Sequence, residues 1–278
     1  MIATSYSGCA VQSKPLFGEI IFADNSSSSE GIMSYNAELK KESKILKEVL
    51  YSSAEFNDEE TKILLTVSDL KISNEKYNFF EFEVSKGTLI PIDMNHKKAS
   101  DEISNVRYVP NSKSISFIRD GFMYIYNPDT RIEKKIDDVD RFTWSKDGSH
   151  FLYSPSSGVI DIYDVKTKKS KFLFNGSDPE YSKDNKYVAY KSVRDDVLCV
   201  KELKTGMIWT YNTKDPVWNY RFSPDGNYIG ILKHDNSSFD SSSSTLIAWD
   251  FKNNDEINLY PEFPGGYDFD WIKGSVAK

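Results

Sequence analysis

One short segment recurs along the chain and constrains its fold more than any other feature. Residues 220–232 read as a strand, a tight Ser-Pro-Asp-Gly turn at 223–226, and a second, more apolar strand. Proline presets φ at the first central position of such a turn, and glycine accepts a positive φ. The pattern returns at 144–153 and at 181–190, where Asn185 takes the place of the turn glycine. A strand–turn–strand unit repeated at this period indicates stacked or radially arranged modules.

The residue that ends the first strand of each unit, called the anchor below, can be followed through most of the chain. We expect four strands per unit, named A to D, with the anchor at the end of strand A. The spacing between successive anchors is 53, 35, 37, 41 and 49 residues. The expected anchors are Phe56, Val109, Trp144, Tyr181, Phe222 and Trp271.

The two ends of the chain complete each other. After Trp271 only residues 272–278 remain, so the last unit has an A strand and little else. The chain opens with a B-like strand at 18–23, followed by a C strand at 31–35 and a D strand at 44–49. Joined, these halves make one complete unit, which predicts an all-β, six-bladed β-propeller of four-stranded antiparallel blades, closed by a blade shared between the two termini.

One segment allows a different interpretation. Residues 37–50 are rich in Lys and Glu, and their apolar residues fall near helical spacing, so an amphipathic helix is the alternative. The strand interpretation agrees with the other five units and is preferred for that reason. Residues 16–278 are then a single propeller domain, and residues 1–15 are a leader remnant or a flexible tether.

Composition excludes several classes of protein. A net charge of −7 and a pI near 5.2 argue against nucleic-acid binding, which needs clustered basic residues. No apolar run approaches the roughly 18 residues of a membrane-spanning helix. Cys9 and Cys199 give no disulfide framework, and the three histidines lack metal-ligand spacing. We therefore expect a monomer without cofactor or metal, and Cys199 as a small buried residue.

The N-terminal segment has one distinctive feature. Tyr6-Ser7-Gly8-Cys9 resembles the cleavage box of a bacterial lipoprotein, in which the cysteine is lipidated. A signal peptide also needs a basic region and an apolar core of about 7–15 residues, and only residues 1–5 stand upstream. A lipid anchor at Cys9 therefore requires an earlier start or a trimmed leader. The alternative is a frayed terminus with an incidental cysteine.

Strand direction indicates where a binding surface would lie. Strands alternate in direction within a blade, so the B–C and D–A loops share one face, and the A–B turns lie on the other. Long B–C loops at 24–30, 68–76 and 233–244 belong to neighbouring units. Loops held by a rigid scaffold commonly carry binding residues, and aromatic and Arg side chains are frequent interface anchors. The expected partner-binding residues, near the starts of A strands, are Arg141, Asp178, Trp218, Asn219, Tyr267 and Asp268.

A catalytic alternative depends on the position just before each anchor. Glu55, Glu180 and Asp270 occupy it in three units, with Arg221 and Tyr108 in two others. If these carboxylates face the central channel, they could act as a hydrolase or lactonase pair. They could equally solvate the channel or pair with Arg221. No nucleophile elbow or phosphate loop supports an enzyme, so we expect a non-enzymatic protein.

At residues 144–148 and 222–226, each followed by an apolar strand, the sequence resembles the repeats of TolB-type WD-like propellers. The resemblance covers roughly residues 16–273 and departs from the pattern at Asn185, at 109–111 and at 56–58. It implies a propeller that binds a protein or an envelope-associated partner. With Cys9, it suggests an extracytoplasmic protein tethered by lipid, or otherwise a cytoplasmic one.

Overall fold

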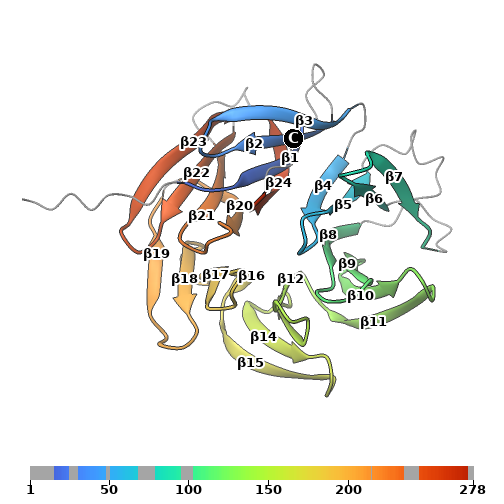
Figure 1. Cartoon of the computed structure of the whole chain (residues 1–278). Coiled ribbons are helices and arrows are strands. Elements are labelled where there is room, and N and C mark those ends of the chain that lie inside the picture. Colours follow the sequence, from blue (N-terminus) through green and yellow to red (C-terminus); the bar gives the residue numbers. More distant parts are fainter. Residues whose placement is uncertain are drawn as a thin grey trace, which may run out of the picture.

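The computed structural model describes residues 16–24, 31–47, 51–67, 79–94, 103–213, 215–234 and 244–274. Side chains at 51, 52 and 265–267 lie outside this description. The described residues form six four-stranded antiparallel sheets arranged as a ring, without a helix (Figure 1). The predicted all-β, six-bladed propeller is therefore confirmed.

Each blade runs from an inner strand A to an outer strand D. Blade 1 comprises β24 (Gly265–Ile272), β1 (Glu19–Asp24), β2 (Gly31–Asn36) and β3 (Lys41–Lys47). Blade 2 comprises β4 (Tyr51–Phe56), β5 (Lys62–Val67), β6 (Phe79–Glu83) and β7 (Thr88–Ile92). Blade 3 comprises β8 (Ile103–Tyr108), β9 (Ile115–Arg119), β10 (Phe122–Asn127) and β11 (Ile132–Asp138).

The remaining blades follow in chain order. Blade 4 comprises β12 (Arg141–Trp144), β13 (His150–Ser154), β14 (Val159–Asp164) and β15 (Lys169–Asn175). Blade 5 comprises β16 (Ser177–Tyr181), β17 (Tyr187–Lys191), β18 (Leu198–Glu202) and β19 (Ile208–Tyr211). Blade 6 comprises β20 (Val217–Phe222), β21 (Ile229–His234), β22 (Ser244–Asp250) and β23 (Asp255–Phe263).

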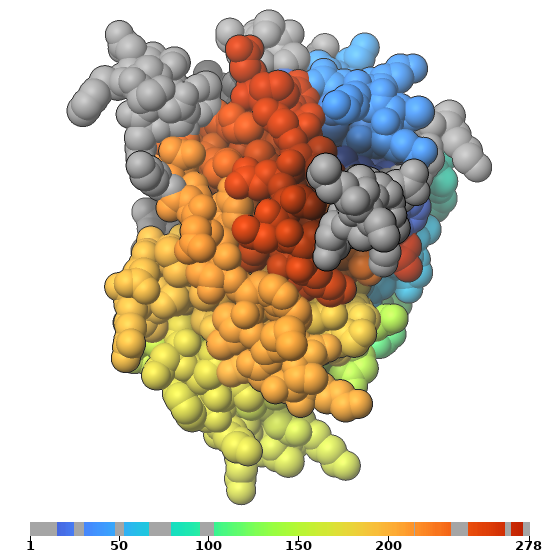
Figure 2. Space-filling model, turned by 90° about the vertical axis from the view of Figure 1, so that its left-hand side faces the viewer, coloured from blue at the N-terminus to red at the C-terminus, as the bar shows by residue number. Residues whose placement is uncertain are grey.

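The ring closes through the pairing of the last strand with the first. β24 is antiparallel to β1, with Trp271 opposite Ile20 and Asp270 opposite Ile21. The Trp271 indole Nε1–H donates to the carbonyl oxygen of Phe17 at 2.9 Å, and its side chain is fully buried. In the side view the red C-terminal strands lie against the blue N-terminal blade (Figure 2). The shared blade is confirmed.

The A–B turns have the chemistry that the repeat predicts. Gly226 and Gly148 have φ of 69° and 68°, and Asn185 takes the same conformation with φ of 59°. Asparagine tolerates this left-handed region better than most residues, which explains its substitution for glycine. In blades 4, 5 and 6 the serine that opens the turn accepts a hydrogen bond from the following strand, as Ser223 Oγ does from the Tyr228 amide at 3.0 Å. One local solution is thus used in several blades.

The hydrophobic core lies between blades rather than in one centre. The six buried clusters each join two consecutive blades, and the cluster between blades 6 and 1 includes Ile20, Phe22 and Trp271. Inner strands are therefore covered on both faces, as β1 is throughout. The outer strand β3 is mostly exposed, which accounts for its Lys and Glu content. The helical alternative for 37–50 is wrong: β3 covers 41–47 and follows a turn at 37–40.

The third anchor corrects one sequence assignment. Tyr108 pairs with Ile115 just as Trp144 pairs with Phe151, so Tyr108 is the anchor and Val109 is the first turn residue. The Val109 amide accordingly donates to Ser114 O, the bond that opens the equivalent turn in other blades. The sequence prediction of Val109 as the anchor is therefore wrong by one residue. The turn after Tyr108 lacks the Asp-Gly pair that marks the end of strand A in other units.

Candidate functional site

Three tiers of side chains surround the channel on the ring axis, two of them on the inner strands and one in the A–B turns. Alternate residues of a strand share a side, so positions one and three before the anchor face the channel. The middle tier, one residue before the anchors, is Glu55, Arg107, Thr143, Glu180, Arg221 and Asp270. Three residues before the anchors, the D–A tier is Ser53, Asn105, Arg141, Asp178, Asn219 and Asp268. Asn105, Arg141, Asp178 and Asn219 line one small cavity, and Asp268 is bonded to Asn219.

The third tier lies in the A–B turns at the opposite end of the channel. It consists of the residues two positions after the anchors: Asp58, Pro110, Lys146, Lys183, Pro224 and Lys273. Below, the channel end at the D–A loops is the D–A mouth, and the end at the turns is the A–B mouth. The two ends carry different side chains and are treated separately.

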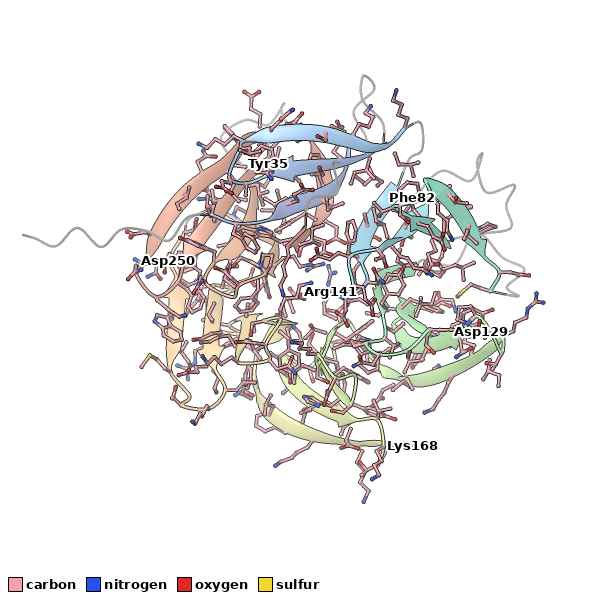
Figure 3. The ribbon with its side chains drawn as sticks, in the orientation of Figure 1. Tyr35, Phe82, Asp129, Arg141, Lys168 and Asp250 are labelled. Atoms are coloured by element: carbon pink, nitrogen blue, oxygen red, sulfur yellow. The ribbon has the colours of Figure 1, made fainter. Side chains whose placement is uncertain are left out.

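The D–A mouth brings together four of the residues predicted to bind a partner. Arg141 lies at the centre of the ring (Figure 3), and its Nε is 3.7 Å from Asp178 Oδ1. Lys191 Nζ reaches the other Asp178 oxygen at 3.4 Å. Asn219 Nδ2 donates to Asp268 Oδ1 at 2.7 Å. The side chain of Arg141 is 54% exposed, so it remains accessible to a ligand.

Trp218 lies at the same mouth and lines a small cavity with Arg141 and Asp178. Its ring centroid is 4.8 Å from that of His234, and the residue is 38% exposed. The indole is therefore supported from one side and open on another. Tyr267 belongs to β24, but its side chain lies outside the described residues, as do Cys9 and most of the three long B–C loops.

The middle tier is held by two arginines. Arg107 donates two hydrogen bonds to Glu180, at 2.8 and 3.3 Å, and its Nε lies 3.5 Å from Glu55 Oε2. Arg221 contacts Glu180 at 3.7 Å and donates to Asp268 at 2.8 Å, which links the middle tier to the D–A mouth. The position before the third anchor is thus occupied by Arg107, not by Tyr108 as the sequence assignment had it.

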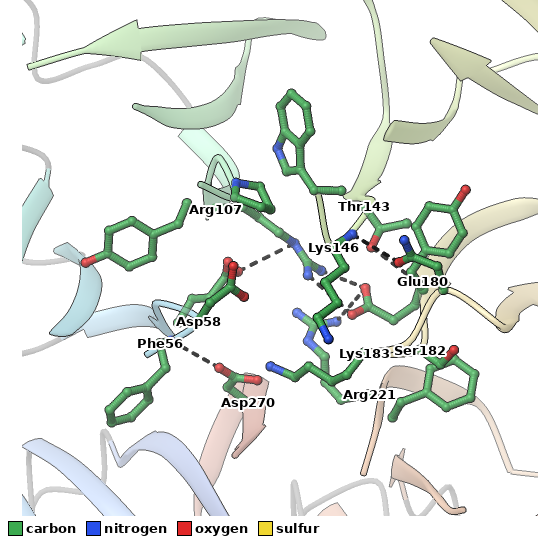
Figure 4. A pocket seen from close by; sticks show the side chains of 17 residues that line it. Phe56, Asp58, Arg107, Thr143, Lys146, Glu180, Ser182, Lys183, Arg221 and Asp270 are labelled. Atoms are coloured by element: carbon green, nitrogen blue, oxygen red, sulfur yellow. Dashed lines mark hydrogen bonds and ion pairs between the residues drawn. The ribbon is translucent and has the colours of Figure 1, made fainter. Parts of the chain in front are cut away.

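All three predicted channel carboxylates line one cavity of about 110 Å³. Glu180 and Asp270 are labelled in Figure 4. Asp270 accepts hydrogen bonds from the amides of Phe56, in the next blade, at 3.0 Å and of Trp271 at 2.8 Å. Glu180 is bound by both arginines. The interpretation that these carboxylates pair with Arg221 therefore holds for Glu180, and Asp270 has a structural role between blades 1 and 2.

Glu55 is the carboxylate with the most perturbed protonation. Its pKa is raised to about 8, chiefly by burial and further by Asp270 and Glu180, against the opposing effect of Arg107 and Arg221. Glu55 is therefore mostly protonated at neutral pH. A neutral carboxyl here is a hydrogen-bond donor, a property that no repeat pattern reveals.

Three further features of the described residues bear on function: metal-ligand clusters, membrane-spanning helices and Cys199. They contain no cluster of three His, Cys, Asp or Glu residues placed to hold a metal ion. Within the same part of the chain, no helix has the length and apolar character to cross a membrane. Cys199 is a free, buried cysteine in β18, as predicted.

Comparisons with known proteins identify the fold. No protein-family model matches the sequence, and no curated protein does. Among solved structures, TolB from Acinetobacter baumannii has a TM-score of 0.55 at 13% identity, covering 87% of this chain and 68% of that one. A putative TolB from Agrobacterium tumefaciens has a TM-score of 0.67 at 13% identity, covering 88% and 89%.

A chain of the nidogen/laminin complex has a TM-score of 0.66 at 9% identity, covering 90% of this chain and 97% of that one. At these identities the similarity concerns the fold, and the function has to be argued from the site itself. This chain is a six-bladed β-propeller whose structural relatives include TolB-type propellers.

Proposed function

We propose that this protein is a non-enzymatic binding propeller whose D–A mouth engages a protein partner. The proposed contact residues are Arg141, Asp178, Trp218, Asn219, Tyr267 and Asp268. The observation that carries the proposal is the exposed indole of Trp218 beside the exposed guanidinium of Arg141. Trp and Arg are the side chains most enriched at the energetic centres of protein interfaces.

The rigidity of this mouth supports the same function. Asp178 and Asn105 hold a left-handed backbone, with φ of 51° and 48°, inside inner strands. The Tyr220 hydroxyl donates to the Asp178 carbonyl oxygen, which ties blade 6 to blade 5 at the mouth. A preorganised surface loses little conformational entropy on binding. The nidogen/laminin structure adds one case in which a chain of this fold occurs in a complex of two proteins.

The proposal includes a place for the protein. We propose an extracytoplasmic location at the cell envelope, with residues 1–15 as a tether and Cys9 as the lipid attachment site. The basis is the sequence of residues 6–9 and the TolB-like fold. Mass spectrometry of the N-terminus from native cells tests this directly. A diacylglycerol adduct on Cys9 supports the tether, and an unmodified Cys9 removes it.

The binding function is tested by quantitative capture from the native organism. Trp218→Ala and Arg141→Ala should each reduce recovery of a specific partner, and with purified partner should raise Kd at least tenfold. Phe172→Ala is the matched control, because Phe172 is a 56% exposed aromatic on the outer strand β15. Equal loss for all three variants, or no loss for the first two, would remove this surface from consideration. Size-exclusion chromatography with light scattering tests the expected monomer.

A second function has one observation in its favour. Glu55, Glu180 and Asp270 line the same cavity, and Glu55 is the protonated carboxyl that a general acid requires. A hydrolase or lactonase is the corresponding candidate. A panel of glycosides and lactones tests it, and Glu55→Gln must abolish any activity found. If no compound of the panel is hydrolysed, the hydrolase candidate is removed and only the binding function remains.

A further inference from the structure

The A–B mouth differs in chemistry from the D–A mouth. Of its six tier positions, three carry lysine, two carry proline and one carries aspartate. This is a net charge of +2 on one ring of a protein whose net charge is −7. The D–A tier, with one arginine and two aspartates, has a net charge of −1. Among the tier residues the lysines therefore gather at the turns, where Glu60 and Asp147 also line the outer funnel.

Lys146 is held in place at this mouth by its neighbours. Its backbone amide donates to Asn185 Oδ1 of blade 5 at 3.0 Å, and its carbonyl oxygen accepts from Asn111 Nδ2 of blade 3 at 3.4 Å. The turn of blade 4 is thus bonded on both sides. The Lys146 side chain extends over the cavity (Figure 4), and no ion pair to its ammonium group is found among the described residues.

Lys183 occupies the equivalent position in blade 5 and also lines the cavity. Partial desolvation at the channel mouth lowers the pKa of Lys183, but the nearby carboxylates, Asp270 foremost, raise it by more. Lys183 is therefore fully protonated at neutral pH. Two ammonium groups from adjacent blades therefore line the same cavity.

The acceptors of this end of the channel are largely used by the protein itself. Glu180 is bound by Arg107 and Arg221, and Asp270 by two backbone amides. On the rim, Glu60 accepts from the amides of residues 273 and 274 at 2.7 Å each. The inner cavity is lined by four basic side chains (Arg107, Lys146, Lys183, Arg221) and four acidic ones (Glu55, Asp58, Glu180, Asp270), so its formal charge is balanced. Glu180 and Asp270 are already bonded to the protein, and the Lys146 ammonium is in no ion pair among the described residues, so a complementary ligand must bring hydrogen-bond acceptors.

The available space sets the size of such a ligand. The inner cavity of about 110 Å³ opens into an outer funnel of about 510 Å³, and the two share Asp58, Lys146, Lys183 and Asn185. We propose that the A–B mouth binds a small oxyanion, a carboxylate- or phosphate-bearing molecule, held by Lys146 and Lys183 above Arg107 and Arg221. The oxyanion enters the inner cavity, and the rest of the molecule occupies the funnel.

Titration calorimetry with inorganic phosphate and with citrate, at constant ionic strength, tests this proposal and separates the two kinds of oxyanion. The wild-type protein should bind at least one of them saturably, with a Kd below about 1 mM. The Lys146→Gln/Lys183→Gln variant should raise Kd at least tenfold. Asp58→Asn should lower Kd, because it removes a negative charge from the funnel. Lys166 is an exposed lysine in the C–D turn of blade 4, the blade that carries Lys146, and Lys166→Gln should bind the probe with the same Kd as the wild type.

The two lysines are exposed, so the double variant should keep its fold, which circular dichroism checks. Should it unfold, amide chemical-shift changes in the wild-type protein provide the readout, because they should be confined to the strand ends and turns that line the two cavities, at 55–60, 107–111, 143–148, 180–185, 221–224 and 270–273. No saturable heat for either probe overturns the proposal, as does unchanged binding by the folded double variant or shift changes elsewhere. Because the partner surface is at the other mouth, loss of phosphate binding here leaves the D–A proposal intact.

Discussion

Substitution of Trp271 by alanine tests whether the last strand truly locks the ring. Trp271 is the anchor of the blade shared by the two termini, and it is fully buried. Its indole donates to the carbonyl oxygen of Phe17. Gly230 of blade 6 packs directly on the indole of Trp271, since a Cβ at Gly230 would lie 3.0 Å from Trp271 Cε3. Trp271 therefore joins blade 6, β1 and the segment before β1.

The expected loss of stability follows from these contacts. Truncation of a buried Trp to Ala costs about 3–5 kcal/mol, since the surroundings refill the cavity only in part. Loss of the indole hydrogen bond, with the Phe17 carbonyl left unpaired, adds about 1 kcal/mol. We expect a decrease of about 4–6 kcal/mol in the free energy of unfolding. For a domain of this size, this corresponds to a Tm lower by roughly 8–24 °C.

Urea denaturation followed by tryptophan fluorescence and circular dichroism measures the effect. Trp144→Ala, at an anchor within the ring, should cost a similar amount, because Trp144 is also buried and donates to Ser116 Oγ at 2.8 Å. Trp218→Ala, at an exposed position, should cost less than about 1 kcal/mol. If Trp271→Ala resembles Trp218→Ala rather than Trp144→Ala, the terminal strand frays independently and the ring is not closed in solution.

Two further predictions concern the channel and the turns. The pKa of Glu55 is about 8 in the folded protein against an ordinary 4.5, so its contribution to stability falls as pH rises from about 4.5 to 8. The Glu55→Gln variant lacks this titration, so its free energy of unfolding should fall less over the same pH range, by up to about 5 kcal/mol at roughly 1.4 kcal/mol per pKa unit. Urea denaturation at several pH values measures the fall in both proteins. Equal dependence of stability on pH in the two would contradict the raised pKa of Glu55. Ser223→Ala should cost about 1–2 kcal/mol, because it leaves the buried Tyr228 amide without its acceptor. Asn227→Ala, at a half-buried position of the same turn, should cost less, and thermal denaturation compares the two variants.

Part of the site could be predicted from the repeat alone. Once the anchors are known, Arg141, Asp178, Asn219 and Asp268 fall at one level of the channel, and the structure places them together. Lys146 and Lys183 were overlooked although they share one repeat position in adjacent units. Their signal was available: counting charges by position relative to the anchor shows the basic ring. The position before the third anchor was missed because the turn after Tyr108 lacks the Asp-Gly pair.

The order of strands, the number of blades and the closure were determined by the sequence itself. They depend on local turn chemistry and on a repeat whose first and last copies are halves of one unit, and both can be read along the chain. Which charges neutralise each other was decided only by the tertiary structure. Arg107, Glu180 and Arg221 come from three blades, and sequence distance says nothing about separations across a ring. The protonation of Glu55 likewise depends on burial among those groups, which exists only after the blades have closed.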